Sequence, residues 1–325
     1  MKKSVKMLAA LAVVALGQTA MANDYPNRPV TLVIGFGAGG PTDVVGRFLA
    51  KQLETELGQP VVVENRLGAN GLVALQYVKR AKPDGYTILM GSSGSLAIEP
   101  AFKKKVDYDV FKDFVPTAPI ASYPYLVVVA NDSPVKTLAQ LISQTKENKT
   151  PMTFASAGNG ADNHLAGEWF ASVVGSKLLH VPYKGGDAAA SLDLIANRVD
   201  FAFLSAVSAL PQIEGGKLRA LAVADDRRAD FIPEVPTVIE ASGLKNFAVG
   251  PWNGLLLPAG APSATVMKLN KAVNKIMATN EARSTLKKLG QYPFRGSPSE
   301  FSAFILQKQT HWAGVVAAAK LERVD

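Results

Sequence analysis

Residues 30–43, with the sequence VTLVIGFGAGGPTD, constrain the fold of this chain more than any other stretch. β-branched and apolar residues fill positions 30–34, which is typical of a buried strand. Four glycines follow, and Pro41 stands where a helix would begin, ahead of apolar residues at helical spacing. A strand, a glycine turn and a helix in this order direct free backbone N–H groups and the positive end of a helix at one point. Such a point favours an anion, so the stretch predicts one side of a carboxylate-binding cleft.

The first 22 residues have the layout of a secretory signal peptide. Lysines at positions 2, 3 and 6 precede an apolar run over 7–16, and Ala-Met-Ala at 20–22 offers a cleavage site. The apolar run is too short to span a bilayer comfortably. Residue 23 is Asn rather than Cys, which excludes a lipid anchor at that position. We expect a soluble, exported protein that begins at residue 23; an uncut N-terminal membrane anchor is the alternative.

Composition limits the classes of protein to which the mature chain can belong. About three hundred residues suffice for two domains of ordinary size. The chain has no cysteine, which excludes thiol chemistry and thiolate metal sites. Its formal net charge of +8 falls to +5 once the three lysines of the signal peptide are subtracted. The remaining basic residues are scattered without interleaved aromatics, which favours a solvated surface over a nucleic-acid site.

Strands alternate with helices along most of the mature chain, which predicts parallel sheets with helices on both faces. Small residues at 91–95 follow one strand, at the carboxyl end where ligands bind in open α/β sheets. The polar and aromatic segment 105–114 is predicted to be a surface loop. The strands are expected at 30–34, 60–64, 86–90, 123–130, 152–155, 178–182, 199–203, 218–223 and 247–257. The helices are expected from Pro41 and at 72–81, 137–147, after 160, 188–196, 264–279, 281–289 and 299–321.

Two long apolar strands, at 123–130 and 247–257, interrupt this alternation and bracket an inserted αβ block. They suggest a hinge that the chain crosses twice. We therefore predict one domain built from residues 23–124 plus 252–325, and a second from residues 125–251. Continuous tandem domains would give a similar pattern.

The spacing Gly35-x-Gly37-x-x-Gly40 also admits a dinucleotide site, with Glu64 where a ribose-binding acid belongs. Export argues against this alternative because nicotinamide cofactors are cytoplasmic. A tight turn without any ligand is a second alternative. We expect no cofactor.

No catalytic set assembles from the candidate residues. The three histidines lie far apart and lack an HExxH-like pair, so we expect no metal site. Ser92 and Ser156 lack the G-x-S-x-G spacing of a nucleophile elbow and are interpreted as hydroxyl donors. Asp43, Asp162 and Asp187 open predicted helices, where a carboxylate caps more often than it catalyses. The chain is therefore predicted to be a binding protein rather than an enzyme.

Neutral hydrogen-bond donors cluster at the ends of the predicted strands. Backbone amides at helix N-termini together with hydroxyls can hold a carboxylate without a full positive charge. Lys184 could pair with an anion or merely solvate a turn, and both interpretations stay open. The donors on one side are Gly39, Gly40, Thr42, Ser92 and Ser93, and those on the other are Ser156, Gly158, Asn159, Gly160 and Gly185.

These motifs identify a family. The run YPNRPVTLVIGFGAGGPTDVVGRFLAKQLETELGQPVVVENRLGANG closely resembles the mature N-terminus of the Bug-type receptors, the periplasmic solute-binding proteins of tripartite tricarboxylate transporters. The runs KPDGYTILMGSSGS, HVPYKGG, NRVDFAF and EVPTVIEASG are similar to later parts of the same family. The resemblance covers essentially the whole mature chain. It implies a two-lobed periplasmic-binding-protein fold of type II, with two αβ domains joined by two crossing strands.

The resemblance also implies that the first-lobe glycine loop contacts a ligand carboxylate, in part through ordered water. One departure concerns Asp162, where many relatives have a small hydroxyl residue; facing inward, it would disfavour a second carboxylate or favour an amine. The candidate ligand-binding residues are Phe36, Gly39, Gly40, Thr42, Asp43, Ser92, Ser93, Ser156, Gly158, Asn159 and Gly160, completed by Lys184, Gly185 and Ser205.

The function implied is that of a monomeric periplasmic receptor that closes on a small carboxylated molecule and delivers it to membrane permease subunits. Dicarboxylates, amino acids, nicotinate and aromatic acids all remain candidate ligands. Two alternatives stay open: a receptor that signals to a sensor kinase, and an exported hydrolase with a base beside Ser92 or Ser156.

Overall fold

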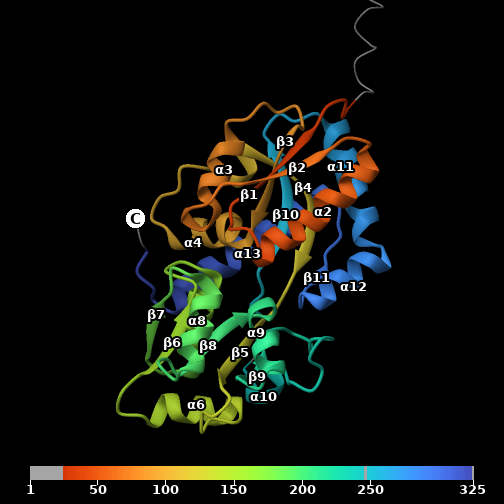
Figure 1. The fold of residues 1–325 in the computed structure, drawn as a ribbon. Helices are drawn as coiled ribbons and strands as arrows, with labels where there is room; N and C mark the ends of the chain where they lie inside the picture. The colour runs from red at the N-terminus through yellow and green to blue at the C-terminus, as the bar shows by residue number, and fades with distance from the viewer. Residues whose placement is uncertain (1–24, 245–246, 324–325) are drawn as a thin grey trace, which may run out of the picture.

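The computed structural model describes residues 25–244 and 247–323, and it consists of two α/β lobes, each built on its own sheet (Figure 1). The predicted signal peptide lies outside the described residues. The first lobe contains a six-stranded sheet in the order β11-β4-β10-β3-β1-β2. Its strands are β1 (Val30–Ile34), β2 (Val61–Asn65), β3 (Thr87–Ser92), β4 (Phe114–Ser122), β10 (Trp252–Pro258) and β11 (Tyr292–Pro293).

The second lobe contains a five-stranded sheet in the order β7-β6-β8-β5-β9. Its strands are β5 (Tyr125–Ala130), β6 (Met152–Ser156), β7 (Leu178–Pro182), β8 (Phe201–Ser205) and β9 (Leu218–Val223). The helices around it are α6 (Leu138–Glu147), α7 (Asp162–Val174), α8 (Gly186–Ile195), α9 (Ala206–Glu214) and α10 (Val238–Ser242).

Both sheets are mixed, which corrects the expectation of purely parallel sheets. β1 pairs in parallel with β2 and β3, and β6 pairs in parallel with β7 and β8. The strands next to the connections run the other way: β10 is antiparallel to β3 and β4, and β5 is antiparallel to β8 and β9. The reason is that the chain enters and leaves the second lobe through these strands rather than through crossover helices.

Helices cover the first sheet unequally. On one face, α2 (Pro41–Leu57) and α11 (Ser263–Met277) pack on the alternate residues Val30, Leu32 and Ile34 of β1. On the other face lie the shorter α3 (Leu72–Lys79) and the long α13 (Pro298–Ala318) (Figure 1). The remaining helical segments are η1 (Ala69–Gly71), η2 (Gly94–Ile98), α4 (Glu99–Phe102), α5 (Val110–Asp113) and α12 (Asn280–Lys288).

The two lobes are joined by two connections that run side by side. One is the Tyr123-Pro124 step between β4 and β5, and the other leads through Val249 and Pro251 into β10. The Tyr123 amide donates to the Pro251 carbonyl at 3.0 Å, and the Tyr125 amide donates to the Val249 carbonyl at 3.3 Å. Each of the two long strands expected from the sequence therefore begins after the connection: β5 begins at residue 125 rather than 123, and β10 begins at residue 252 rather than 247.

An aromatic core extends across the boundary between the lobes. Trp169 of α7 stacks on Phe247 with ring centroids 4.6 Å apart and meets Trp312 of α13 edge-on at 6.4 Å. Trp252 of β10 packs against Phe301 of α13 at 5.7 Å. Because these side chains are buried together, they hold the two lobes against each other.

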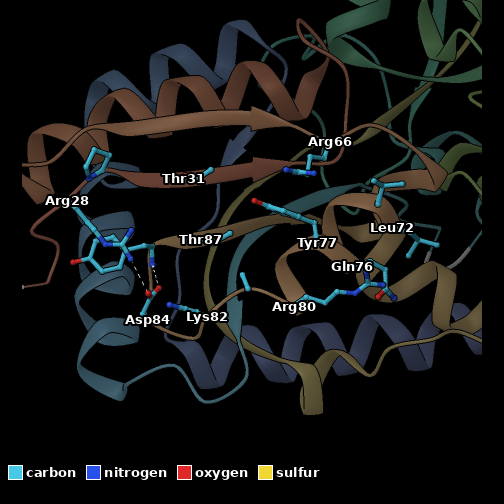
Figure 2. Close-up of a pocket in the computed structure, with 14 residues that line it drawn as sticks. Arg28, Thr31, Arg66, Leu72, Gln76, Tyr77, Arg80, Lys82, Asp84 and Thr87 are labelled. Atoms are coloured by element: carbon cyan, nitrogen blue, oxygen red, sulfur yellow. Dashed lines mark hydrogen bonds and ion pairs between the residues drawn. The ribbon is translucent and has the colours of Figure 1, made fainter.

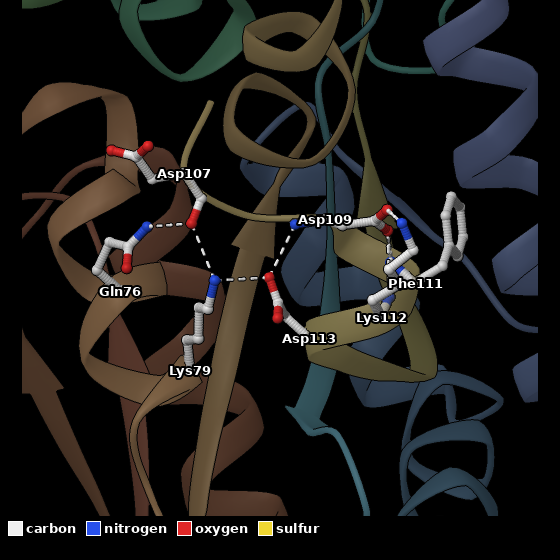
Figure 3. Close-up of polar contacts among 7 residues, drawn as sticks. All are labelled: Gln76, Lys79, Asp107, Asp109, Phe111, Lys112 and Asp113. Atoms are coloured by element: carbon white, nitrogen blue, oxygen red, sulfur yellow. Dashed lines mark hydrogen bonds and ion pairs between the residues drawn. The ribbon is translucent and has the colours of Figure 1, made fainter. Parts of the chain in front are cut away.

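The segment 105–114, expected to be a surface loop, is instead folded against the first lobe (Figure 3). Tyr108 and Val110 are buried, and the Asp109 side chain caps α5 by accepting the amides of Phe111 and Lys112. Lys79 of α3 contacts Asp113 at 2.8 Å, and its Nζ donates to the Asp107 carbonyl at 2.9 Å. These contacts fix the outer side of α3.

Within the described residues, no helix combines the length and the apolar character that a membrane crossing needs.

Candidate functional site

A cavity of about 700 Å³ lies between the two lobes. It is bordered by the carboxyl ends of β1 and β3 and by the N-terminal ends of α2, α8 and α9. The lining comprises residues 35–42, 67–70, 92–94 and 251–253 from the first lobe, and Tyr123, Tyr125, Ala157, 161–162, 184–188 and 207–208 from the connection and the second lobe.

The glycine loop after β1 supplies much of the first wall. Gly39 has φ of +81°, a conformation that favours glycine, and Gly40 is the extended N-cap of α2. Pro41 begins the helix, so the first amides of α2 that lack an intrahelical acceptor are those of Thr42 and Asp43. Phe36, Gly39, Gly40 and Thr42 line the cavity as the sequence predicted. The positive end of α2 therefore faces a space that a carboxylate can enter.

Asp43 lies behind this loop and does not line the cavity, which corrects its assignment as a ligand contact. Its side chain is buried and accepts hydrogen bonds from the Gly39 amide at 2.9 Å, Arg47 Nε at 2.8 Å and Asn65 Nδ2 at 2.7 Å. Burial raises the pKa of Asp43, but these hydrogen bonds outweigh it and hold the pKa below its ordinary value. Asp43 is thus a carboxylate that braces the glycine loop.

An unpartnered donor lies beside the loop. Asn253 of β10 lines the cavity and is 1% exposed, and its Oδ1 accepts the Thr42 hydroxyl at 3.4 Å. Its Nδ2 is buried and has no hydrogen-bond partner among the described residues. A buried amide N–H without an acceptor is costly, and it is satisfied when a ligand oxygen arrives. No local pattern in the sequence pointed to Asn253, because β10 joins the site only through the order of strands in the sheet.

Ser92 and Ser93 line the cavity as predicted, and Ser93 also contacts the second lobe. The Ser93 hydroxyl donates to Oδ1 of Asp162 at 2.5 Å, so the two lobes meet across the cavity. Asp162 therefore faces inward, which settles the orientation that its departure from the family left open. Burial raises the pKa of Asp162 to about 6.

The second wall is formed by the starts of α8 and α9. Lys184, Gly185 and Asp187 line the cavity. Asp187 is braced from behind: its Oδ2 accepts the Ser205 amide at 2.9 Å and the Ser205 hydroxyl at 2.6 Å, and its Oδ1 accepts Asn163 Nδ2 at 2.9 Å. Ser205, a predicted ligand contact, is therefore engaged by Asp187 and does not line the cavity.

Two tyrosines that the sequence did not single out complete the wall near the connection. Tyr123 and Tyr125 line the cavity, with ring centroids 6.4 Å apart. Burial raises the pKa of both hydroxyls well above the ordinary value, and the carboxyls of Asp162 and Asp187 raise it further. Both tyrosines are therefore neutral and able to donate a hydrogen bond.

Most of the predicted second-lobe loop does not reach the cavity. Ala157 and Ala161 line it, whereas the four predicted contacts lie behind or outside it: Ser156, Gly158, Asn159 and Gly160. Ser156 and Gly160 are buried against two histidines, and Asn159 is exposed to solvent. The Gly160 amide donates to Nδ1 of His164 at 3.1 Å, and the rings of His164 and His180 stack 4.0 Å apart.

Burial lowers the pKa of His164 to about 3 and that of His180 to about 4, so both rings are neutral at pH 7. His180 Nε2 lies 2.5 Å from the Ser156 hydroxyl, the contact that a hydrolase would need. Ser156 is fully buried and lies outside the cavity lining, however. The pair therefore lies outside the cavity lining and supports the loop.

The electrostatics of the cavity come mainly from backbone. Lys184 is the one cationic side chain among the described lining residues, and it shares this lining with the acidic Asp162 and Asp187. The positive helix ends of α2, α8 and α9 offset these carboxyls and supply directional N–H donors. Such a site can hold an anion by hydrogen bonds and release it unchanged.

A cavity of this kind, between two α/β lobes and rich in neutral donors, defines a solute-binding receptor. The chain belongs to the tripartite tricarboxylate transporter family receptors, which it matches over residues 45–321. The motifs that resemble Bug-type receptors in the sequence therefore identify the family correctly.

Three comparisons illustrate the similarity. Protein BugT of Bordetella pertussis is 32% identical over 315 residues, covering 96% of each chain. The structure described as R. palustris Rpa4515 with adipate has a TM-score of 0.85 and 32% identity, covering 91% of this chain and 99% of that one. The structure of MatC from Rhodopseudomonas palustris with bound malate has a TM-score of 0.80 and 33% identity, covering 90% and 100%.

Proposed function

We propose that this chain is a periplasmic receptor that closes on a small dicarboxylate in the cavity between its lobes and delivers it to the permease of a tripartite tricarboxylate transporter. The observation that carries this proposal is the buried Asn253 Nδ2, which lacks an acceptor beside the free amides of α2. Related structures hold adipate and malate, which favours a dicarboxylate.

The proposed contacts divide between the lobes. One ligand carboxylate accepts from the first amides of α2 and from Asn253, and the other end accepts from the starts of α8 and α9 and from Lys184. We assign residues 23–124 and 252–325 to the first lobe and 125–251 to the second. Neither lobe holds the ligand alone, so binding favours the closed arrangement of the two. The motion pivots at the paired connections near Tyr123 and Pro251.

Membership of the family supports the following cellular role. The receptor is exported by a signal peptide cleaved after residue 22, acts as a monomer, and presents its closed form to membrane permease subunits. The fully buried Ser156 supports binding without turnover, because a nucleophile must be reachable by its substrate.

A thermal-shift screen tests the proposal. Adipate and malate should raise the melting temperature of the wild-type protein, because a ligand that binds only the folded state stabilises it. Adipamide, which has the length of adipate without its charge, should not. Chelation should leave the shifts unchanged.

The Gly40→Phe variant tests whether the ligand binds at the proposed site. Gly40 has φ of −73°, which any residue adopts, and phenylalanine there would fill the space before α2. Its Cβ would lie 3.3 Å from the Gly37 carbonyl oxygen, so the loop must shift slightly to admit it. The variant should fold but lose the adipate and malate shifts. Gly314→Phe is the matched control, since a side chain at exposed Gly314 meets nothing within 4 Å. Retained shifts in Gly40→Phe would contradict the proposed site.

A further inference from the structure

A second concavity lies on the outer side of the first lobe, away from the cavity between the lobes. It is a groove of about 870 Å³ (Figure 2). Its floor includes Thr31 of β1 and Thr87 of β3, which are direct partners in the sheet. One wall is α3, and the far end is formed by Arg28 and Tyr86. No residue that lines this groove also lines the cavity.

The groove exists because α3 is too short to cover its face of the sheet. Val30 and Leu32 of β1 point into the core under α2, so Thr31 points to the opposite face. Val62 of β2 is the sheet partner of Thr31 and shares that face, and it is 55% exposed. α3 spans eight residues, and contacts at Lys79 hold its outer side in place. The amino-terminal half of three strands is therefore left without a covering helix.

Two arginines in the groove are fixed on aromatic rings. The Arg28 guanidinium lies 3.7 Å from the centre of the Tyr86 ring, and the Arg66 guanidinium lies 3.4 Å from that of Tyr77. Stacking of this kind orients the planar group and leaves its edge free to meet a carboxylate. Arg66 Nε is buried and has no acceptor among the described residues.

Positive charge in the groove exceeds negative charge. Arg28 pairs with Asp84 at 3.1 Å, and Arg66 pairs with Glu64 at 2.6 Å. Arg80 and Lys82 also line the groove and are exposed, and neither makes an ion pair or a side-chain hydrogen bond within the described part of the chain. Four cations thus face two carboxylates, and the two unpaired cations lie together at the end of α3.

Apolar side chains border the same groove. Among the ten large apolar side chains that are exposed in the described residues, Val73 and Tyr77 line the groove, and Val62 lies on the same face of the sheet as Thr31. Clustered exposed apolar groups mark interaction surfaces, and Tyr and Arg are enriched where proteins meet. The other face of the same sheet carries no such cluster, since α2 and α11 bury it.

We propose that this groove is the docking site for a partner protein that inserts an acidic, extended segment. Its carboxylates meet Arg80 and Lys82, and its apolar side chains pack on Val62 and Val73. A protein segment fits better than a small anion because the cations are spread along an open groove with an apolar border rather than converging on one point. A concave surface also fits a membrane poorly.

Docking here would touch the segment that borders the ligand cavity. Arg66 lines the groove, and the next four residues, 67–70, line the cavity. The partner would therefore contact a segment that continues into the wall of the cavity. The inference concerns a surface separate from the proposed ligand site and does not require that site to bind a carboxylate.

Fluorescence anisotropy with a defined probe tests the proposal. The probe is a short fluorescein-labelled peptide in which glutamates alternate with leucines, and the protein is the full mature chain. Saturable binding is expected, and Arg80→Glu combined with Lys82→Glu should weaken it about tenfold. The matched control is Lys149→Glu combined with Lys217→Glu, which makes the same charge change at exposed lysines of the second lobe and should leave binding within about twofold.

Three outcomes would overturn the proposal. One is that the peptide shows no saturable binding, and another is that both double variants lose affinity for it equally. The third is that citrate displaces the peptide completely when the two are present at equal concentrations of carboxylate groups. Binding of phosphatidylglycerol vesicles in place of the peptide would assign the groove to a membrane and also overturn it. The malate-induced thermal shift separates the two sites. It should persist in Arg80→Glu/Lys82→Glu, whereas its absence from the wild-type protein would contradict the proposed function alone.

Discussion

The cavity between the lobes and the groove on the first lobe both favour anions, but they do so with opposite means. The cavity uses backbone amides at helix starts and a single cation, Lys184, and it keeps two carboxyls inside. The groove uses exposed guanidinium and ammonium groups beside aromatic rings. Buried backbone amides bind an anion in a fixed direction, and salt affects their affinity little. Exposed charged side chains attract an anion from a distance, and dissolved salt screens this attraction. The first arrangement suits a small solute that must be released, and the second suits a partner that must be found.

The largest expected effect is on the stability of the fold when the hydrogen bonds of Asp187 in the second wall of the cavity are removed. Asp187→Ala would leave the Ser205 amide and hydroxyl and Asn163 Nδ2 without their acceptor in a buried place. The free energy of unfolding should fall by about 3 kcal/mol, measured by urea denaturation. Dicarboxylate binding should weaken with it.

Asp193→Ala is the control on the same helix. Asp193 accepts the Tyr183 hydroxyl at 2.8 Å and pairs at 2.9 Å with Arg198, whose side chain is largely exposed, so the expected loss is clearly smaller than that of Asp187→Ala. Similar losses of unfolding free energy in the two variants would show that the buried hydrogen bonds of Asp187 contribute no more than a surface ion pair.

Salt sharpens the comparison between the two sites. Raising potassium chloride from low to high concentration should weaken the acidic peptide at the groove by about tenfold, because the charges of Arg80 and Lys82 are exposed to solvent. Malate in the cavity should weaken by less than about twofold. Titration calorimetry for malate and anisotropy for the peptide measure the two series. An equal dependence on salt would remove the distinction between the sites.

The pH dependence of dicarboxylate binding should follow Asp162. Burial raises its pKa from an ordinary 3.8 to about 6, so it carries a proton below pH 6 and a negative charge above. The charge would repel a second ligand carboxylate, so affinity should fall severalfold as pH rises through 6. Titrations between pH 5 and 7 measure this effect, and Asp162→Asn should remove it.

The raised pKa of Asp162 also makes the free energy of unfolding depend on pH. Between about pH 4 and 6 the folded protein keeps a proton on Asp162 that the unfolded chain releases, so this residue lowers the free energy of unfolding as pH rises through that window. A ligand affinity that is flat with pH in the wild-type protein would contradict an inward-facing, protonated Asp162.

The smallest effect is expected at Arg47. Its pair with Asp43 is half exposed, and Asp43 keeps the Gly39 amide and Asn65 when the arginine is replaced. Arg47→Gln should lower the free energy of unfolding only slightly and weaken malate binding by about twofold. A loss as large as that of Asp187→Ala would mean that the ion pair, rather than the amides, shapes the glycine loop.

Local patterns were enough to predict the first wall of the cavity. The strand, glycine turn and helix over residues 30–57 follow from apolar alternation, glycine and Pro41, all of which act within a few residues.

Several elements were missed because local signals opposed them. β4 contains Pro116 and Pro119, which argue against a strand and are tolerated here beside the very short β11. α9 contains Pro211, which hides its helical pattern.

The rest of the site depends on contacts between distant segments. Asn253 reaches Thr42 across 211 positions of the chain because β10 inserts between β3 and β4. Ser205 and Ser156 have the residue type of ligand contacts, but Asp187 and His180 engage them behind the cavity wall. Sequence motifs placed the loops correctly and could not decide which side chains face inward.

A crystal structure of the mature protein with malate or adipate tests the central claim most directly. The account predicts one ligand carboxylate within hydrogen-bond distance of the Thr42 amide and Asn253 Nδ2, directly or through a single water, and the other end against the starts of α8 and α9. A ligand held by Lys184 alone, or bound only in the outer groove, would contradict it.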